Sequence, residues 1–125
     1  MIKFLRFPSF SKKSSINDSI DLSEIKPYTF VLARVYFEEG TEYKSRPVLV
    51  IMLDPISGLM VTSSNTQKGY VPRDPVSCGI SPKSKIRTDR KITLTPPDIL
   101  SILGVLPEDE RIDFKIYLSK NPPTH

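Results

Sequence analysis

Apolar residues fall into short stretches along this chain, and proline, glycine or charged residues separate each stretch from the next. The most apolar of them, Val48 to Leu53, contains only aliphatic side chains and methionine, a composition that predicts a strand covered on both faces. Pro47 precedes it, at the first position of a strand, where a missing N–H is tolerated. We therefore predict a strand from Pro47 to about Leu53, with Arg46 held at its entrance after a loop, Glu42 to Ser45.

Alternating apolar and polar residues predict further strands on either side of this run. They are Thr29 to Phe37, Leu59 to Thr62, Ser84 to Thr88 and Lys91 to Leu94. Asp54 to Gly58 carries proline and glycine at turn positions, so the strands before and after it should form a hairpin. In that hairpin Thr62 lies near the start of the preceding strand, where its hydroxyl and the Arg46 guanidinium can meet over one phosphate.

The rest of the chain is less regular. Asn65 to Ser84 is rich in proline and glycine, and its length is typical of a binding loop. Pro96-Pro97-Asp98 predicts a short helical turn that runs to Leu103 and ends at Gly104. From Pro107 to Lys120, alternating apolar residues suit a strand, whereas acidic residues at the start and lysines later suit a helix and its dipole. We favour the helix, so the predicted fold class is mainly β with one C-terminal helix.

Composition restricts the class of protein. The chain has 125 residues, of which 38% are hydrophobic and 26% charged, as in one globular domain, and its 12 prolines leave little room for long helices. A single cysteine, Cys78, rules out an internal disulfide and the usual zinc clusters, which suits a reducing cytoplasm. No stretch has the length of a membrane span, so we expect a cytoplasmic protein without a membrane partner. The net charge of +4 favours an anionic partner.

Basic residues gather in two places. Residues 1–26 form a basic N-terminal extension that we expect to be partly ordered, with phenylalanines between the cations, and residues 27–125 form a single domain. The extension either stacks on bases and holds phosphates or packs a phenylalanine or two on the body. Lys85 and Arg87 share one face of a predicted strand, while Ser84 and Ile86 take the other. That basic face is either solvated or a phosphate-contacting patch.

Several short motifs carry a resemblance to a known family. Phe30 to Phe37, the Glu-Glu-Gly turn that follows, Lys44 to Ile51 and Gly58 to Ser64 resemble the first half of the PemK/MazF family of toxin endoribonucleases. Gly79-Ile80, Ser84 to Asp89, Ile99 and Leu103 to Leu106 resemble its second half. The resemblance covers about residues 27–120, and the motifs occur in the family's order. Two features depart from it: Tyr28-Thr29 stands where the family usually has Gly-Asp, and the N-terminal extension is added.

The resemblance implies an SH3-like barrel of the type shared by CcdB, MazF and PemK, with a short helical turn and a C-terminal helix. It implies a homodimer that cuts single-stranded RNA at short sequences without a metal or other cofactor. It also implies a type II toxin–antitoxin system, in which an acidic antitoxin protein neutralises the toxin.

Carried over by position, the resemblance gives catalytic roles to Arg46, Thr62 and Glu42, with Glu38 or Glu39 as alternatives to Glu42. Arg46 would balance charge on the phosphate, Thr62 would hold a nonbridging oxygen, and Glu42 would act as base or orient the 2′-hydroxyl. The expected RNA-binding residues are Lys44, Ser63, Ser64, Lys68, Tyr70, Ser84, Lys85 and Arg87.

Other chemistries find little support in the sequence. The only histidine is His125, so a ribonuclease mechanism with two histidines is unavailable, and no residues have metal-ligand spacing. Ser63 and Ser64 lack the partner of a serine hydrolase. Two other functions stay open: a toxin of the same fold that acts on DNA gyrase through its C-terminal helix, and an SH3-like RNA-binding module that does not cleave.

Overall fold

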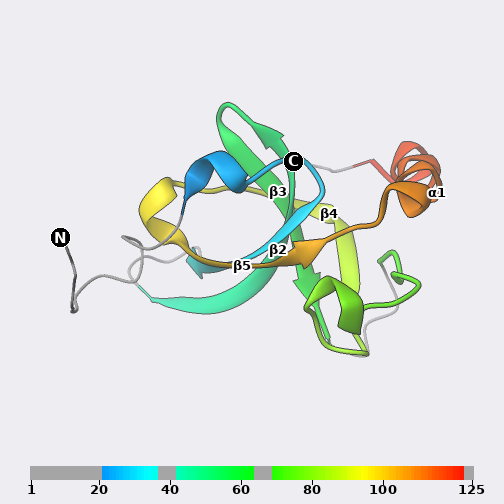
Figure 1. Cartoon of the computed structure of the whole chain (residues 1–125), viewed down its shortest axis with the longest axis horizontal. Helices are drawn as coiled ribbons and strands as arrows, with labels where there is room; N and C mark the ends of the chain where they lie inside the picture. The colour runs from blue at the N-terminus through cyan, green and yellow to red at the C-terminus, as the bar shows by residue number, and fades with distance from the viewer. Residues whose placement is uncertain (1–20, 37–41, 64–68, 123–125) are drawn as a thin grey trace, which may run out of the picture.

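The computed structural model describes residues 21–36, 42–63 and 69–122. Its centre is a five-stranded antiparallel sheet with the strand order β4-β3-β2-β1-β5 (Figure 1). The strands are β1 (Thr29–Tyr36), β2 (Tyr43–Leu53), β3 (Ile56–Thr62), β4 (Lys85–Thr93) and β5 (Ile99–Val105). The helices are α1 (Glu108–Lys120) and the short 3-10 turns η2 (Leu22–Glu24), η3 (Val76–Cys78) and η4 (Pro96–Asp98). A mainly β fold with a C-terminal helix is thus confirmed, and the sheet is open because β4 and β5 are its two edges.

The β2–β3 hairpin is present, but its turn is shorter than predicted. Leu53 pairs with Ile56, so only two residues separate the strands. Gly58, which we expected in the turn, lies inside β3 opposite Val50. Glycine is required there by packing, since a Cβ atom would collide with the carbonyl of Leu49.

Strand β2 also begins earlier than predicted. Tyr43 to Ser45, which we expected in a loop, pair with β1, and the rings of Tyr43 and Tyr36 lie 5.4 Å apart across the two strands. Such cross-strand aromatic pairs stabilise a hairpin, so this contact extends the strand. Pro47 is therefore inside β2, where pairing with β3 has not yet begun, and this one-sided position tolerates proline.

Two predictions for the second half are wrong. The strands predicted at Ser84 to Thr88 and Lys91 to Leu94 are one strand, β4, because an irregularity in its pairing with β3 lets it bend without breaking. The helical turn predicted to reach Leu103 ends at Asp98, and β5 follows directly. Pairing with β1 makes this segment a strand, since Ile99 gains a backbone partner there and becomes fully buried.

Apolar side chains pack on both faces of the sheet. One cluster, here called the helix-side core, lies with α1 and η3 and includes Phe30, Leu49 and Phe114. The other, the turn-side core, includes Val31 and Val48 and is completed by residues that follow η2 and β4. The ends of the molecule differ accordingly, with η2 and η4 at one end and α1 at the other (Figure 1).

This arrangement removes one reason for expecting a dimer. Strand β1 carries apolar residues on both faces, a pattern that would favour a second copy as cover if one chain could not bury both. Its two faces are instead covered within one chain, by the helix-side core and the turn-side core. The homodimer therefore rests on the family resemblance. In the described part of the chain, no helix has the length and apolar character needed to cross a membrane.

Candidate functional site

Arg46 lies inside β2, on the face of the sheet that bears the turn-side core. Its cross-strand partner in β1 is Ala33, a member of that core, and directly paired residues share a face. The Arg46 side chain is partly buried, yet its guanidinium makes no hydrogen bond or ion pair with the described residues. It is thus a cation at the edge of an apolar core, and no residue in the described ranges balances its charge.

Thr62 and Lys85 lie on the same face as Arg46. They are a direct pair between β3 and β4. Pairing between β2 and β3 ends at Val48 and Met60, and Arg46 and Thr62 each lie two residues beyond that pair. Residues two apart in a strand point the same way, and neighbouring strands are about 4.8 Å apart. Arg46, Thr62 and Lys85, here called the strand-end row, therefore span three adjacent strands at one end of the sheet.

Glu42 is not brought alongside this row. It is exposed and directly precedes β2, so extended backbone separates it from Arg46. Four residues of strand correspond to about 13 Å. Lys44 is closer to Arg46 than Glu42 is, because it lies only two residues before Arg46 in β2 and on the same face. Its side chain is exposed. The alternative carboxylates Glu38 and Glu39 lie outside the described residues.

Arg87 is engaged by a neighbour on its own strand. Its Nε donates to Oδ1 of Asp89 at 2.9 Å, and a terminal nitrogen donates to Oδ2 at 2.7 Å. This two-point contact lowers the pKa of Asp89. Arg87 is also only 19% exposed. Lys85 and Arg87 share one face of β4, and the guanidinium of Arg87 is therefore already bound by a carboxylate.

The other expected RNA-binding residues are spread over different environments. Ser63 is exposed just after β3, whereas Ser84 is 2% exposed and belongs to the interior. Tyr70, which we expected to bind RNA, packs against Phe114 of the helix-side core. Burial and the hydrogen bond of its hydroxyl to Glu110 raise the pKa of Tyr70. Ser64 and Lys68 lie outside the described residues.

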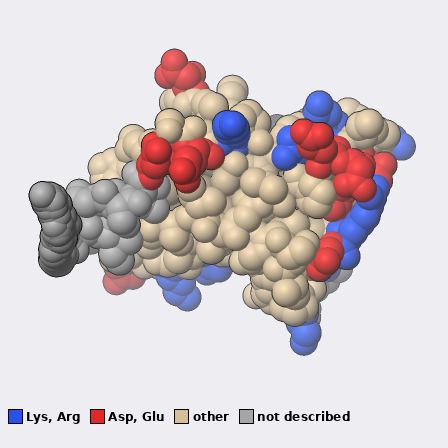
Figure 2. All heavy atoms as spheres, viewed as in Figure 1, with Lys and Arg blue, Asp and Glu red and all other residues tan. Residues whose placement is uncertain are grey.

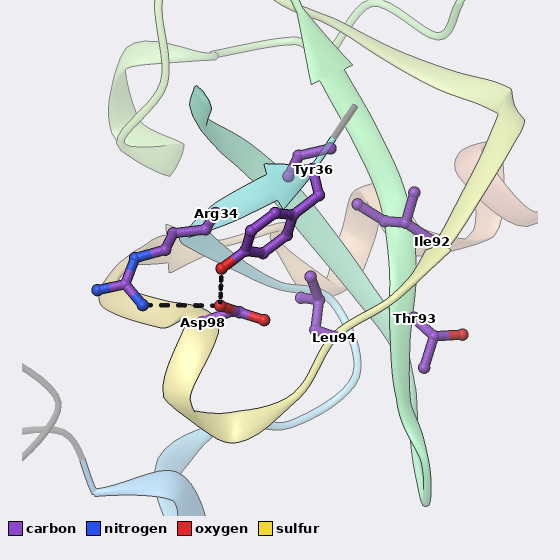
Figure 3. A pocket seen from close by; sticks show the side chains of 7 residues that line it. Arg34, Tyr36, Ile92, Thr93, Leu94 and Asp98 are labelled. Carbon is purple, nitrogen blue, oxygen red and sulfur yellow. Dashed lines mark hydrogen bonds and ion pairs between the residues drawn. The ribbon is translucent and has the colours of Figure 1, made fainter. Parts of the chain in front are cut away.

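A second candidate region was not found from the sequence. A hollow of about 250 Å³ opens between the end of β1, the end of β4 and η4. Arg34, Tyr36 and Asp98 point toward one another at its rim (Figure 3). The Tyr36 hydroxyl donates to Asp98 at 3.2 Å, and a guanidinium nitrogen of Arg34 lies 3.6 Å from the same carboxylate. Partial desolvation and this hydrogen bond raise the pKa of Tyr36.

The hollow exists because β1 is longer than its partner on that side. Pairing between β1 and β5 ends at Ala33 and Ile99, so residues 34–36 have no strand beside them there. The η4 turn occupies that position and accepts a hydrogen bond from Arg34 at the Pro97 carbonyl, 3.3 Å away. In the sequence, Arg34 and Tyr36 indicate only one face of a strand, and Asp98 only the start of a short helical turn. Only the topology brings them together.

Charges elsewhere on the surface are mixed. Figure 2 shows lysines and arginines interspersed with carboxylates toward the end of the molecule that carries α1. Arg73 is paired there with Asp113 and lies 3.5 Å from Asp109. That end is therefore less suited to a polyanion than the strand-end row.

Comparisons with known proteins assign no function to this site. No protein-family model matches the sequence, and no curated protein matches it. In the three described ranges, no group of three or more histidine, cysteine, aspartate or glutamate residues is placed to hold a metal ion. The site that the geometry supports is thus a row of basic and hydroxyl side chains at a strand end, with an aromatic and charged hollow nearby.

Proposed function

We propose that this chain is the toxin of a type II toxin–antitoxin system, a metal-independent endoribonuclease that cleaves single-stranded RNA. The observation that carries the proposal is the strand-end row, in which Arg46 and Thr62 take the positions that the PemK/MazF resemblance gives to the catalytic pair. An arginine whose charge is unbalanced by the described residues suits a phosphate, because its planar fork matches two phosphate oxygens.

The chemistry follows from the charge that develops during cleavage. The RNA's own 2′-hydroxyl attacks the neighbouring phosphorus, a P–O bond forms, and the bond to the 5′-oxygen breaks. Arg46 stabilises the extra negative charge on the phosphate and can relay a proton to the leaving oxygen, while the base takes the proton of the 2′-hydroxyl. Thr62 donates a hydrogen bond to a nonbridging oxygen. Lys85 and Lys44 bind flanking phosphates. Glu42 keeps the role of base only as part of this proposal, since a carboxylate about 13 Å along the strand must be brought closer.

The wider assignment rests on the same resemblance. The bent antiparallel sheet and C-terminal helix are compatible with an SH3-like barrel of the type shared by CcdB, MazF and PemK. We further propose a cytoplasmic homodimer that is neutralised by a cognate acidic antitoxin. The antitoxin's acidic tail would compete with RNA for Arg46 and the basic residues around it, because carboxylates and phosphates are bound by the same cations.

The direct test is cleavage of a long single-stranded RNA in excess EDTA by the wild type and three variants. We expect Arg46→Ala and Thr62→Ala each to lower the rate by about 100-fold or more, since each removes a group that stabilises the developing charge. Arg90→Ala is the matched control, because Arg90 is an exposed arginine of β4 outside the strand-end row. Circular dichroism of each variant checks that the fold is retained.

Each outcome selects one function. Strict dependence on a divalent ion, or full activity of Arg46→Ala, would contradict the proposal. RNA binding without cleavage by the wild type would favour the alternative of a non-catalytic RNA-binding module. Inhibition of DNA gyrase that Arg46→Ala leaves intact would favour the gyrase-directed toxin.

A further inference from the structure

The hollow beside η4 has the character of a small recognition site. Val35, Ile92 and Leu94 contribute apolar side chains to its wall beside Thr93, and its rim carries Arg34, Tyr36 and Asp98 (Figure 3). A volume of about 250 Å³ is below that of sites for drug-sized ligands, so it suits a single ring system. Tyr36 is 47% exposed, which leaves much of its ring available for stacking.

The rim presents donors and acceptors in a defined order. Asp98 accepts hydrogen bonds from Tyr36 and, at 2.7 Å, from the Thr95 hydroxyl. A carboxylate offers about four acceptor sites, so further donors can be bound. Beside it, the Arg34 guanidinium donates one of its five N–H groups to the Pro97 carbonyl and lies 3.6 Å from Asp98 as an ion pair. The rim therefore offers a ligand the remaining N–H donors of Arg34 next to the two acceptor oxygens of Asp98.

From this order we propose that the hollow binds one guanine base of a single-stranded RNA. The Watson–Crick edge of guanine carries one acceptor, O6, followed by two donors, N1–H and the N2 amino group. It complements a guanidinium beside a carboxylate, while the base stacks on Tyr36. Uracil would turn carbonyl oxygens toward Asp98, and adenine and cytosine have only one amino donor on this edge. This inference rests on the proposed function, to which it adds the base that the enzyme reads.

The hollow lies within reach of the strand-end row. Val35 in its wall pairs with Lys44, and Ala33, two residues earlier in β1, pairs with Arg46. Two residues of strand correspond to about 7 Å. Arg34 and Tyr36 alternate with these residues along β1, so an RNA whose phosphate contacts Arg46 reaches them by passing Lys44 and the end of β1 that has no β5 neighbour.

The experiment measures base selectivity separately from cleavage. Labelled RNA heptamers of uridine with guanosine, inosine, adenosine, cytidine or uridine at the centre are titrated with the full-length Arg46→Ala chain, and binding is followed by fluorescence anisotropy. We expect guanosine to bind about tenfold more tightly than uridine. Inosine lacks only the N2 amino group, so it should lose much of that preference. The inosine comparison alters the ligand and keeps the protein the same, and it therefore holds even where Asp98→Asn fails to fold.

Asp98→Asn, added to the same chain, exchanges one acceptor for a donor and should abolish the preference for guanosine. Asp54→Asn is the matched control, because Asp54 is exposed in the β2–β3 turn, and it should keep the preference. Equal binding of all five heptamers, or a preference unchanged by Asp98→Asn, would overturn the inference. The failure of the proposed function would look different. If the wild type cuts no RNA but the Arg46→Ala chain prefers guanosine and loses that preference with Asp98→Asn, the endoribonuclease is refuted and the guanine site is supported.

Discussion

The hydroxyl of Tyr70 donates a hydrogen bond of 2.7 Å to the buried carboxylate of Glu110 and so connects the 69–84 segment to α1. The same carboxylate oxygen accepts the backbone N–H of Arg73 at 2.9 Å. The Tyr70 ring packs edge-on against Phe114, with ring centres 5.2 Å apart. A segment with little regular structure is therefore fixed near its start by one side chain of the C-terminal helix.

Glu110→Ala should lower the free energy of unfolding by about 2–3 kcal/mol, because it leaves two partly buried donors without their acceptor. Tyr70→Phe, which removes one of these hydrogen bonds, should cost about 1–2 kcal/mol. Chemical denaturation measures both. Glu108→Ala is the control, since Glu108 is exposed in the same helical turn and its loss should cost less than about 1 kcal/mol. A Glu110→Ala variant as stable as the control would show that the buried carboxylate contributes nothing to the fold.

Tyr70 also predicts how stability changes in alkali. Burial and Glu110 raise its pKa in the folded state above the ordinary value of 10.0, so above pH 10 the unfolded chain loses this proton and the folded chain keeps it. Its contribution is complete below pH 10 and is lost as the pH rises, by up to about 1.4 kcal/mol per pH unit. Denaturation at pH 9 to 11.5 should show a shallower decline for Tyr70→Phe than for the wild type. Parallel curves would mean that Tyr70 titrates alike in both states.

The sequence predicts the elements whose local pattern and tertiary environment agree. The run from Val48 to Leu53 is a strand, and the acidic residues after Pro107 begin a helix, as both patterns indicate. Ile99 to Leu103 could not be recognised in this way. The diproline before it favours a helical turn, whereas pairing with β1 makes it a strand. Contacts between residues far apart in the chain decided the state of this segment.

In the candidate site, too, some contacts could be predicted from the sequence and others could not. Arg46 and Thr62 could be placed near each other only roughly from one hairpin, because the turn that sets the strand register is shorter than the sequence predicted. The engagement of Arg87 by Asp89 was not predicted, although both residues lie in one short strand, because alternation says nothing about which charges pair. The Arg34 and Asp98 contact joins β1 to η4 across 64 positions of sequence, and no local pattern reports such a contact.

Gly79 tests how closely the η3 turn packs on β5. Its φ of 85° lies in the left-handed region, and a Cβ atom there would collide with the carbonyl of Leu103. Gly79→Ala should therefore lower the free energy of unfolding by about 2 kcal/mol or more. Val76→Ala in the same turn should change it by less than about 0.5 kcal/mol, because Val76 is 63% exposed. Thermal unfolding of the two variants gives the comparison, and equal stabilities would place β5 further from the turn.

The last prediction separates the basic residues by the salt dependence of RNA binding. Each phosphate contact of a single strand contributes about 0.7 to the slope of log affinity against log salt. Lys44 is exposed and lies on the face of Arg46, so Lys44→Gln should reduce the slope by about that amount. Arg87→Gln should reduce it less, because its guanidinium is held by Asp89 at two points.

Asp89→Asn provides the reverse change in the same assay. It weakens the hold on Arg87, which can then turn to a phosphate, so the slope should steepen by up to about 0.7. Anisotropy titrations of one RNA at several salt concentrations give all the slopes needed. If Arg87→Gln flattens the slope as much as Lys44→Gln, Arg87 leaves Asp89 when RNA binds, and the pairing in the free protein does not restrict the phosphate contacts.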